Sequence, residues 1–209
     1  MQVRVKICGI TNLDDALAAV DSGADAIGFV FFQGSPRYVP HDYAASIIRK
    51  LPPVITTIGV FVNEKPEQIE KIVLRTAIDA IQLHGDEPPQ VHPLSRRVIK
   101  AIRVKNLESL DPLIDYQGEV SAFLLDTYAP DVFGGTGRIF NWNIALEAKQ
   151  FGKIILAGGL TPDNVAEAVK QVMPYGVDVS SGVELEKGRK DQKKMKVFIE
   201  RAKAVQTAS

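Results

Sequence analysis

Cysteine is almost absent from this sequence, which holds a single one, Cys8, among 209 residues. One cysteine excludes an internal disulfide and a zinc site made of several thiolates. No run approaches the roughly 18 consecutive apolar residues that a membrane-spanning helix needs. The first six residues, MQVRVK, also lack the apolar core of a secretory signal. We therefore expect a soluble, cytoplasmic protein with no membrane partner.

The sequence also lacks an excess of charge of either sign. Its 25 Lys and Arg residues balance its 25 Asp and Glu residues, so no basic field predicts a nucleic-acid partner. A composition of 45% hydrophobic and 24% charged residues is typical of globular proteins and excludes intrinsic disorder. The length favours one compact unit, and we predict a single domain over residues 1–209.

Short β-branched runs alternate with stretches of helical periodicity along the whole chain. The predicted strands are Val3–Cys8, Ala26–Phe31, Ile55–Phe61, Ala80–His84, Val98–Ile102, Ala122–Asp126, Ile154–Ala157 and Gly176–Val179. The clearest predicted helices are Asn12–Ser22, His41–Leu51, Lys65–Arg75, Asn141–Gln150, Pro162–Val172 and the lysine-rich Asp191–Ala204. Strict alternation implies parallel strands with right-handed crossovers, and eight such units predict an α/β fold, a single (β/α)8 TIM barrel.

Polar residues fall on the strand faces that should point into this barrel. In the first strand Val5 and Ile7 should pack on helices, which leaves Lys6 and Cys8 inside. The same alternation places further polar residues inside at the carboxyl ends of other strands: Gln82, His84, Asp178 and Ser180, with Asp126 ending the sixth strand. Barrel enzymes carry their chemistry at this end, so the pattern predicts a site there.

Each of these residues also has a purely structural interpretation. A lone cysteine is most often a small buried apolar residue. An aspartate at a strand end is more often a turn residue or a helix cap than an acid catalyst. A histidine or glutamine in a strand can simply complete a hydrogen bond in the core. The convergence of four strands on one rim favours the functional interpretation.

Two glycine-containing turns indicate the class of ligand. Ala157-Gly158-Gly159-Leu160-Thr161-Pro162 follows the seventh predicted strand, and Ser180-Ser181-Gly182-Val183 follows the eighth. Adjacent glycines let a phosphate approach backbone N–H groups, and the loops after strands seven and eight bind phosphate in many barrels. We predict phosphate binding by Gly158, Gly159, Ser180, Ser181 and Gly182. The alternative is that these glycines only permit tight turns.

Two further loops have both a functional and a plain interpretation. Arg37, in Ser35-Pro36-Arg37-Tyr38, could pair with a substrate carboxylate in a bidentate manner or be a solvated surface residue. The glycine-rich stretch Ala129–Phe140 could close as a lid or serve as a flexible connector.

Nearly the whole chain carries motifs that resemble those of phosphoribosylanthranilate isomerase. They are Lys6-Ile7-Cys8-Gly9-Ile10-Thr11, Gly28-Phe29-Val30-Phe31, Ser35-Pro36-Arg37, Gly59-Val60-Phe61, Gln82-Leu83-His84-Gly85-Asp86-Glu87, Leu125-Asp126-Thr127, Gly134-Gly135-Thr136-Gly137, Leu156-Ala157-Gly158-Gly159-Leu160 and Asp178-Val179-Ser180-Ser181-Gly182-Val183-Glu184. The motifs occur in the order of the family, which makes the resemblance specific.

The resemblance implies an Amadori rearrangement in tryptophan biosynthesis that needs no cofactor and no metal. N-(5-phosphoribosyl)anthranilate becomes 1-(2-carboxyphenylamino)-1-deoxyribulose 5-phosphate. By analogy with the family, Asp126 is the general acid, Cys8 the general base, and Arg37 the residue that holds the anthranilate carboxylate. The remaining inward polar residues, Gln82, His84 and Asp178, would contact the substrate, and the two glycine turns would hold its phosphate.

Two other functions stay open on the sequence. Another cofactor-free phosphosugar isomerase or epimerase is one, although His41, His84 and His92 do not supply the metal ligands that a metal-dependent epimerase needs. A non-catalytic barrel that binds a phosphorylated ligand is the other. The oligomeric state, monomer or homodimer, also stays open.

Overall fold

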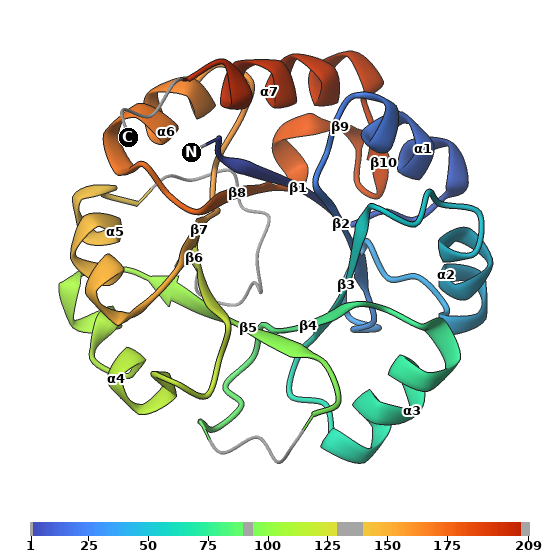
Figure 1. Ribbon diagram of the computed structural model, residues 1–209, viewed down its shortest axis with the longest axis horizontal. Coiled ribbons are helices and arrows are strands. Elements are labelled where there is room, and N and C mark those ends of the chain that lie inside the picture. The colour runs from blue at the N-terminus through green and yellow to red at the C-terminus, as the bar shows by residue number, and fades with distance from the viewer. Residues whose placement is uncertain (1, 90–93, 129–139, 206–209) are drawn as a thin grey trace.

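Eight parallel strands close into a barrel in the computed structural model, which describes residues 2–89, 94–128 and 140–205. The strands are β1 (Arg4–Cys8), β2 (Ala26–Val30), β3 (Thr56–Phe61), β4 (Ala80–Leu83), β5 (Arg97–Val104), β6 (Ala122–Thr127), β7 (Ile154–Leu156) and β8 (Gly176–Val179). They follow one another around the ring in chain order, and β8 pairs with β1 to close it (Figure 1). The predicted barrel is confirmed, and each predicted strand end lies within two residues of the observed one.

Helices cover the outside of the barrel (Figure 1). They are α1 (Leu13–Asp21), α2 (His41–Ile48), α3 (Pro66–Thr76), α4 (Leu113–Tyr116), α5 (Asn143–Ala148), α6 (Val165–Val172) and α7 (Gln192–Ala204), with short 3₁₀ turns at Leu107–Leu110, Lys149–Phe151 and Ser181–Val183. The described residues between β4 and β5 form no helix, as the prolines there predict. A small antiparallel hairpin, β9 (Glu184–Glu186) with β10 (Arg189–Lys190), follows β8. No helix in the described ranges is long and apolar enough to cross a membrane.

Side-chain caps set where two of the helices, α1 and α7, begin. The Asn12 side chain accepts a hydrogen bond from the backbone N–H of Asp15 at 2.8 Å, and Asp191 caps α7 in the same way. The helix predicted to start at Pro162 instead starts at Val165. Its start is delayed because Asn164 accepts from the Thr161 N–H and donates to the Gly159 carbonyl, which holds this stretch as a turn.

Two apolar cores lie on the two sides of the strand ring. The larger lies between strands and helices and holds the outward side chains, such as Ile7, Leu83 and Val179. The smaller fills the barrel itself with Ile58, Ala80, Ile99, Ala101, Ala122, Leu124, Ile155 and Ala157. Since Leu124 lies inside, the alternation also turns Asp126 toward the interior of the barrel.

Truncation of one outward side chain should show how much the outer core contributes to stability. Ile81 is fully buried in it, whereas Ile114 on α4 is 58% exposed. Ile81→Ala should lower the free energy of unfolding by about 2–5 kcal/mol, because it leaves a cavity. Ile114→Ala removes the same atoms and should change it by less than about 0.5 kcal/mol. Urea unfolding of both variants measures the difference, and equal losses would contradict this packing.

Candidate active site

The carboxyl ends of the strands bring the predicted polar residues to one mouth of the barrel. Cys8 ends β1, His84 directly follows β4, Asp126 lies near the end of β6, and Asp178 lies in β8. A small cavity of about 40 Å³ opens among the ends of β6, β7 and β8. Its lining includes Asp126, Asp178, the two glycines of the first turn and the Ser180–Gly182 segment. Both glycine turns predicted from the sequence to bind phosphate therefore border one space.

A buried ion pair lies beside the cysteine. Lys6 Nζ donates to Asp178 Oδ1 at 2.9 Å, and the two side chains are only 4% and 9% exposed. Burial alone would lower the pKa of Lys6, but the attraction of Asp178 and Cys8 outweighs it and raises this pKa. Lys6 is therefore a permanent positive charge inside the barrel.

The Cys8 thiol is governed by two opposing effects. Burial raises its pKa, while the positive charge of Lys6 lowers it; the negative charge of Asp178 adds to the increase. The net result is a pKa above the ordinary value. In the ligand-free barrel the thiol is thus held protonated. The positive charge of Lys6 lowers the free energy that its ionisation requires.

A second polar chain crosses the mouth from β4 to β6. Gln82 Nε2 lies 2.9 Å from His84 Nδ1, and His84 Nε2 lies 3.3 Å from Asp126 Oδ2. The other carboxylate oxygen of Asp126 accepts from the backbone N–H of Thr127 at 2.8 Å. Gln82 is fully buried, and its Oε1 has no hydrogen-bond partner among the described residues. His84 Nε2 is also buried and makes no hydrogen bond to a described residue, so the imidazole lies beside the carboxylate without being hydrogen-bonded to it.

The two glycine turns present backbone donors to the same cavity. Gly158 and Gly159 have φ angles of +77° and +65°, which favour glycine. A Cβ added to Gly182 would lie 1.9 Å from the Leu160 carbonyl oxygen, so the two turns pack directly on each other. No described residue accepts a hydrogen bond from the backbone N–H of Gly159, Ser181 or Gly182. These donors are free to bind an anion.

Arg37 lies close to the cysteine but is already engaged with a carboxylate of this chain. Its Nε and Nη2 donate to the two oxygens of Glu184, both at 2.7 Å. A Cβ added to Gly9 would lie 2.6 Å from Arg37 Cδ, so the arginine stem runs along the backbone next to Cys8. Glu184 belongs to one of the family motifs, but no local sequence pattern predicted its contact with Arg37. The predicted lid over Ala129–Phe140 lies outside the described residues except for Phe140, which is buried.

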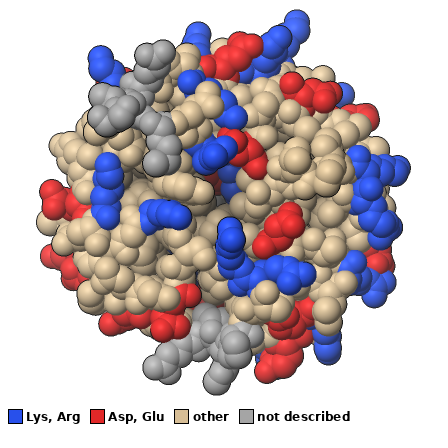
Figure 2. Space-filling view, in the orientation of Figure 1, with Lys and Arg blue, Asp and Glu red and all other residues tan. Residues whose placement is uncertain are grey.

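A larger hollow of about 440 Å³ lies at the opposite mouth. The N-terminal ends of the strands line it, with Arg4, Arg97 and Lys153 among the residues at its edge. Figure 2 looks on to this mouth and shows Lys and Arg side chains around its centre. The predicted catalytic and phosphate-binding residues are at the other end, so this hollow is not the candidate site. Among the residues that the structure describes, no cluster of three or more His, Cys, Asp or Glu could hold a metal.

Comparison with known proteins identifies the family. The family model of N-(5'-phosphoribosyl)anthranilate isomerase matches residues 5–201. The chain belongs to the phosphoribosylanthranilate isomerase family. Its relatives include the isomerase of Geobacter metallireducens, 58% identical over 97% of this chain and 100% of the relative.

Solved structures of phosphoribosylanthranilate isomerases share the fold. The isomerase of Thermotoga maritima superposes with a TM-score of 0.89 at 44% identity, over 97% of this chain and 100% of that one. A second structure, 43% identical with a TM-score of 0.86 over the same shares of the two chains, contains reduced 1-(o-carboxyphenylamino)-1-deoxyribulose 5-phosphate. A third, 41% identical with a TM-score of 0.85 over the same shares, shows monomers generated from the dimeric Thermotoga maritima isomerase.

The opposing influences on Cys8 predict shifts of opposite sign in its titration. Lys6→Met should raise the thiol pKa further, because it removes the group that lowers this pKa. Asp178→Asn should lower it, because it removes a nearby negative charge. Thiolate absorbance against pH measures both, since this is the sole cysteine of the chain, and Cys8→Ser supplies the baseline. Shifts of the same sign in the two variants would rule out this electrostatic account.

Proposed function

We propose that this chain converts N-(5'-phosphoribosyl)anthranilate into 1-(2-carboxyphenylamino)-1-deoxyribulose 5-phosphate by an Amadori rearrangement, in tryptophan biosynthesis. The chain belongs to the isomerase family, and one observation on its own residues supports the proposal. A buried thiol and a buried carboxyl group, Cys8 and Asp126, lie at the barrel mouth whose loops offer free backbone donors. A base, an acid and an anion site are what an isomerisation of a phosphorylated aminosugar requires.

In the first step Asp126 acts as the general acid. It donates a proton to the ring oxygen of the furanose, the bond from this oxygen to C1 breaks, and the amine nitrogen forms a Schiff base with C1. His84 lies beside this carboxylate, with its Nε2 3.3 Å from Asp126 Oδ2.

In the second step the ionised fraction of Cys8, which Lys6 stabilises against the effect of burial, acts as the general base. It removes the proton from C2 of the sugar, and the electron pair of that bond neutralises the Schiff base to give an enolamine. Proton return to C1 and loss of the enol proton then give the ketone. Lys6 favours this step, because its positive charge stabilises the thiolate.

The remaining residues of the site bind the two charged ends of the substrate. The turns that contain Gly158, Gly159 and the Ser180–Gly182 segment hold the phosphate through backbone N–H groups. Arg37 holds the anthranilate carboxylate, while Gln82, His84 and Asp178 contact the sugar. No cofactor or metal takes part in these steps.

We also propose how the chain is organised in the cell. Residues 1–209 act as a single barrel domain in the cytoplasm, and the small phosphorylated substrate is the ligand. Neither nucleic acid nor a membrane is a partner. Both a monomer and a homodimer agree with this mechanism, because every proposed site residue comes from one chain.

Removal of the acid or the base should slow the reaction without unfolding the chain. Asp126→Asn and Cys8→Ser should each lower kcat by about 10²-fold or more, the usual contribution of one positioned proton-transfer group. Cys8→Asp should retain more activity than Cys8→Ser, because a carboxylate can accept the proton. Decay of the fluorescence of freshly made phosphoribosylanthranilate, with no metal or cofactor added, measures the rates. A Cys8→Ser variant as fast as the parent would show that the cysteine only packs.

Phosphate binding through backbone groups predicts that a glycine matters more than a serine side chain. Gly159→Val should raise KM and the dissociation constant of inorganic phosphate, because its side chain blocks the approach to the N–H groups. Ser181→Ala should have a smaller effect. Gly118, with a φ of +88° and no atoms near its Cβ position, serves as the control for backbone strain. Gly118→Val should lower the melting temperature but leave phosphate affinity unchanged; equal losses of affinity in Gly159→Val and Ser181→Ala would contradict the assignment.

A further inference from the structure

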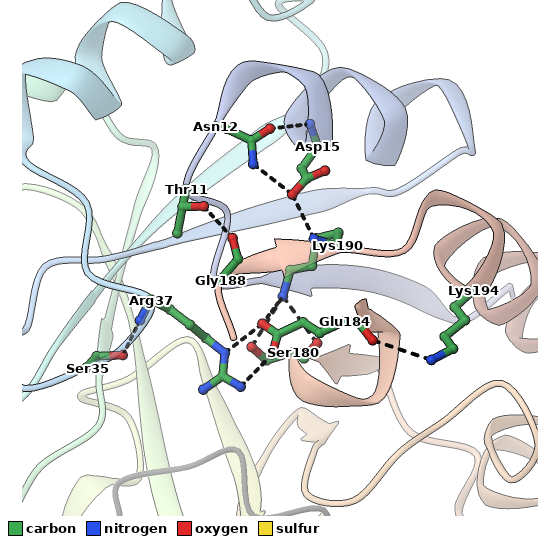
Figure 3. A network of polar contacts seen from close by, with 10 residues as sticks. All are labelled: Thr11, Asn12, Asp15, Ser35, Arg37, Ser180, Glu184, Gly188, Lys190 and Lys194. Atoms are coloured by element: carbon green, nitrogen blue, oxygen red, sulfur yellow. Dashed lines mark hydrogen bonds and ion pairs between the residues drawn. The ribbon is translucent and has the colours of Figure 1, made fainter. Parts of the chain in front are cut away.

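A buried carboxylate and a buried ammonium join the loops that surround the proposed substrate site (Figure 3). The side chains of Glu184 and Lys190, in the hairpin after β8, are 6% and 0% exposed. Lys190 Nζ donates to Glu184 Oε1 at 2.9 Å, and Glu184 in turn accepts both hydrogen bonds from Arg37. Three charged groups therefore form one row from the hairpin to the arginine.

The ammonium group also contacts the second of the two proposed phosphate-binding turns, residues 180–182, called the phosphate loop below. Lys190 Nζ lies 3.2 Å from the Ser180 carbonyl oxygen and 3.5 Å from the Ser180 hydroxyl oxygen. Ser180 begins the segment whose backbone N–H groups are free. One ammonium group thus holds the start of the phosphate loop and, through Glu184, the guanidinium of Arg37.

The backbone of the same lysine reaches the loop that follows the cysteine. The Lys190 N–H donates to Asp15 Oδ2 at 2.8 Å, and Asn12 Nδ2 donates to this same oxygen at 2.8 Å. Thr11 Oγ1 donates to the Gly188 carbonyl, a second link between the two loops. The hairpin is therefore fixed to the loops after β1, β2 and β8 together.

The guanidinium of Arg37 keeps one free edge in this arrangement. Glu184 occupies Nε and Nη2, and no described residue accepts a hydrogen bond from Nη1. A guanidinium held by two parallel bonds on one side presents its remaining N–H groups in a fixed direction, which a flexible lysine ammonium would not do. Its orientation is set before any ligand binds, so less conformational entropy is lost on binding.

Glu184 attracts both cations of the row, whereas burial and the charge of Arg37 lower the pKa of Lys190. Burial raises the pKa of Glu184, but hydrogen bonds from Arg37 and the nearby charge of Lys190 outweigh it, and the net pKa is lowered. The hydrogen bonds to Glu184 raise the pKa of Arg37 above its ordinary value. Glu184 is thus ionised at neutral pH and can hold the arginine throughout the catalytic cycle.

We infer that Glu184 and Lys190 are positioning residues that fix the carboxylate-binding Arg37 relative to the phosphate loop, and so set the distance between the two anionic ends that a substrate must span. The inference rests on the proposed function and deepens it, because it names what determines the specificity of that site. Neither residue needs to touch the reacting atoms. Their contribution should therefore appear in binding rather than in the chemical step.

The test compares Glu184→Gln with Glu186→Gln, its matched control in the same hairpin. The Glu186 side chain is 71% exposed, and its one ion pair among the described residues is weak: Oε1 lies 3.8 Å from Nη1 of Arg189, which is also exposed. Glu184→Gln should raise KM about tenfold with kcat nearly unchanged, since it weakens the hold on Arg37. Glu186→Gln should match the parent in both. A fall in kcat with unchanged KM, or identical behaviour of the two variants, would overturn the inference.

Two ligands separate a positioning role from a general loss of structure. The reduced product, which carries the carboxylate, should bind Glu184→Gln about tenfold more weakly, whereas its analogue without the carboxylate should bind it as it binds the parent. Lys190→Met should weaken both ligands, because Lys190 also holds the phosphate loop. Equal weakening of both ligands by Glu184→Gln would show a merely structural role.

A double-mutant cycle keeps the inference testable if a buried substitution unfolds the chain. In Arg37→Met/Glu184→Gln, the KM should be no higher than in Arg37→Met alone, since Glu184 acts through Arg37. If Glu184→Gln does not fold, Arg37→Lys retains the charge but not the two parallel bonds and should show the same rise in KM. Additive effects, or an Arg37→Lys variant equal to the parent, would overturn the inference.

The proposed function can fail separately from this inference. If the parent protein does not turn over phosphoribosylanthranilate, the proposed function is wrong whatever the variants do. If the parent is active and Glu184→Gln equals its Glu186 control, the inference alone is wrong.

Discussion

The pairing of β8 with β1 closes the barrel, and the geometry of the site depends on it. Lys6 and Asp178 stand opposite each other in the register of this pairing, and their side chains form the buried ion pair. Because all eight strands are parallel, closure brings every carboxyl end to the same mouth. An open sheet of the same strands would leave Cys8 on one edge strand and Asp178 on the other.

Closure also places the proposed functional groups on a continuous arc of strands. Around the ring, β6 carries Asp126, β7 and β8 carry the phosphate turns, β1 carries Cys8, and Arg37 follows β2. The phosphate site thus lies between the acid and the base, and the carboxylate site lies beyond the base. Along this arc Cys8 therefore lies between the two anion sites, and Asp126 lies on the far side of the phosphate site. The hairpin after β8 then fixes the outer part of the arc through Glu184 and Lys190.

The sequence was sufficient to predict the barrel and the mouth, because both follow from local rules. Alternation along each strand correctly placed Lys6 and Asp178 inside, and the order of strands and helices implied closure. It did not show that Arg37 contacts Glu184, since these residues are 147 positions apart and no local pattern pairs them. The start of α6 was also missed, because Asn164 hydrogen-bonds locally and delays the helix. Contacts between loops depend on tertiary structure, which single-sequence periodicity does not contain.

The central claim is that Asp126 opens the sugar ring and Cys8 removes the proton from C2. The most direct measurement is the deuterium isotope effect on turnover of phosphoribosylanthranilate labelled at C2, in Cys8→Asp and in Asp126→Asn. A poorer base makes C2 proton removal slower, so Cys8→Asp should show a larger isotope effect than the parent. A missing acid makes ring opening limiting, so Asp126→Asn should show none. An isotope effect that grows in Asp126→Asn and disappears in Cys8→Asp would contradict the assignment of the two roles.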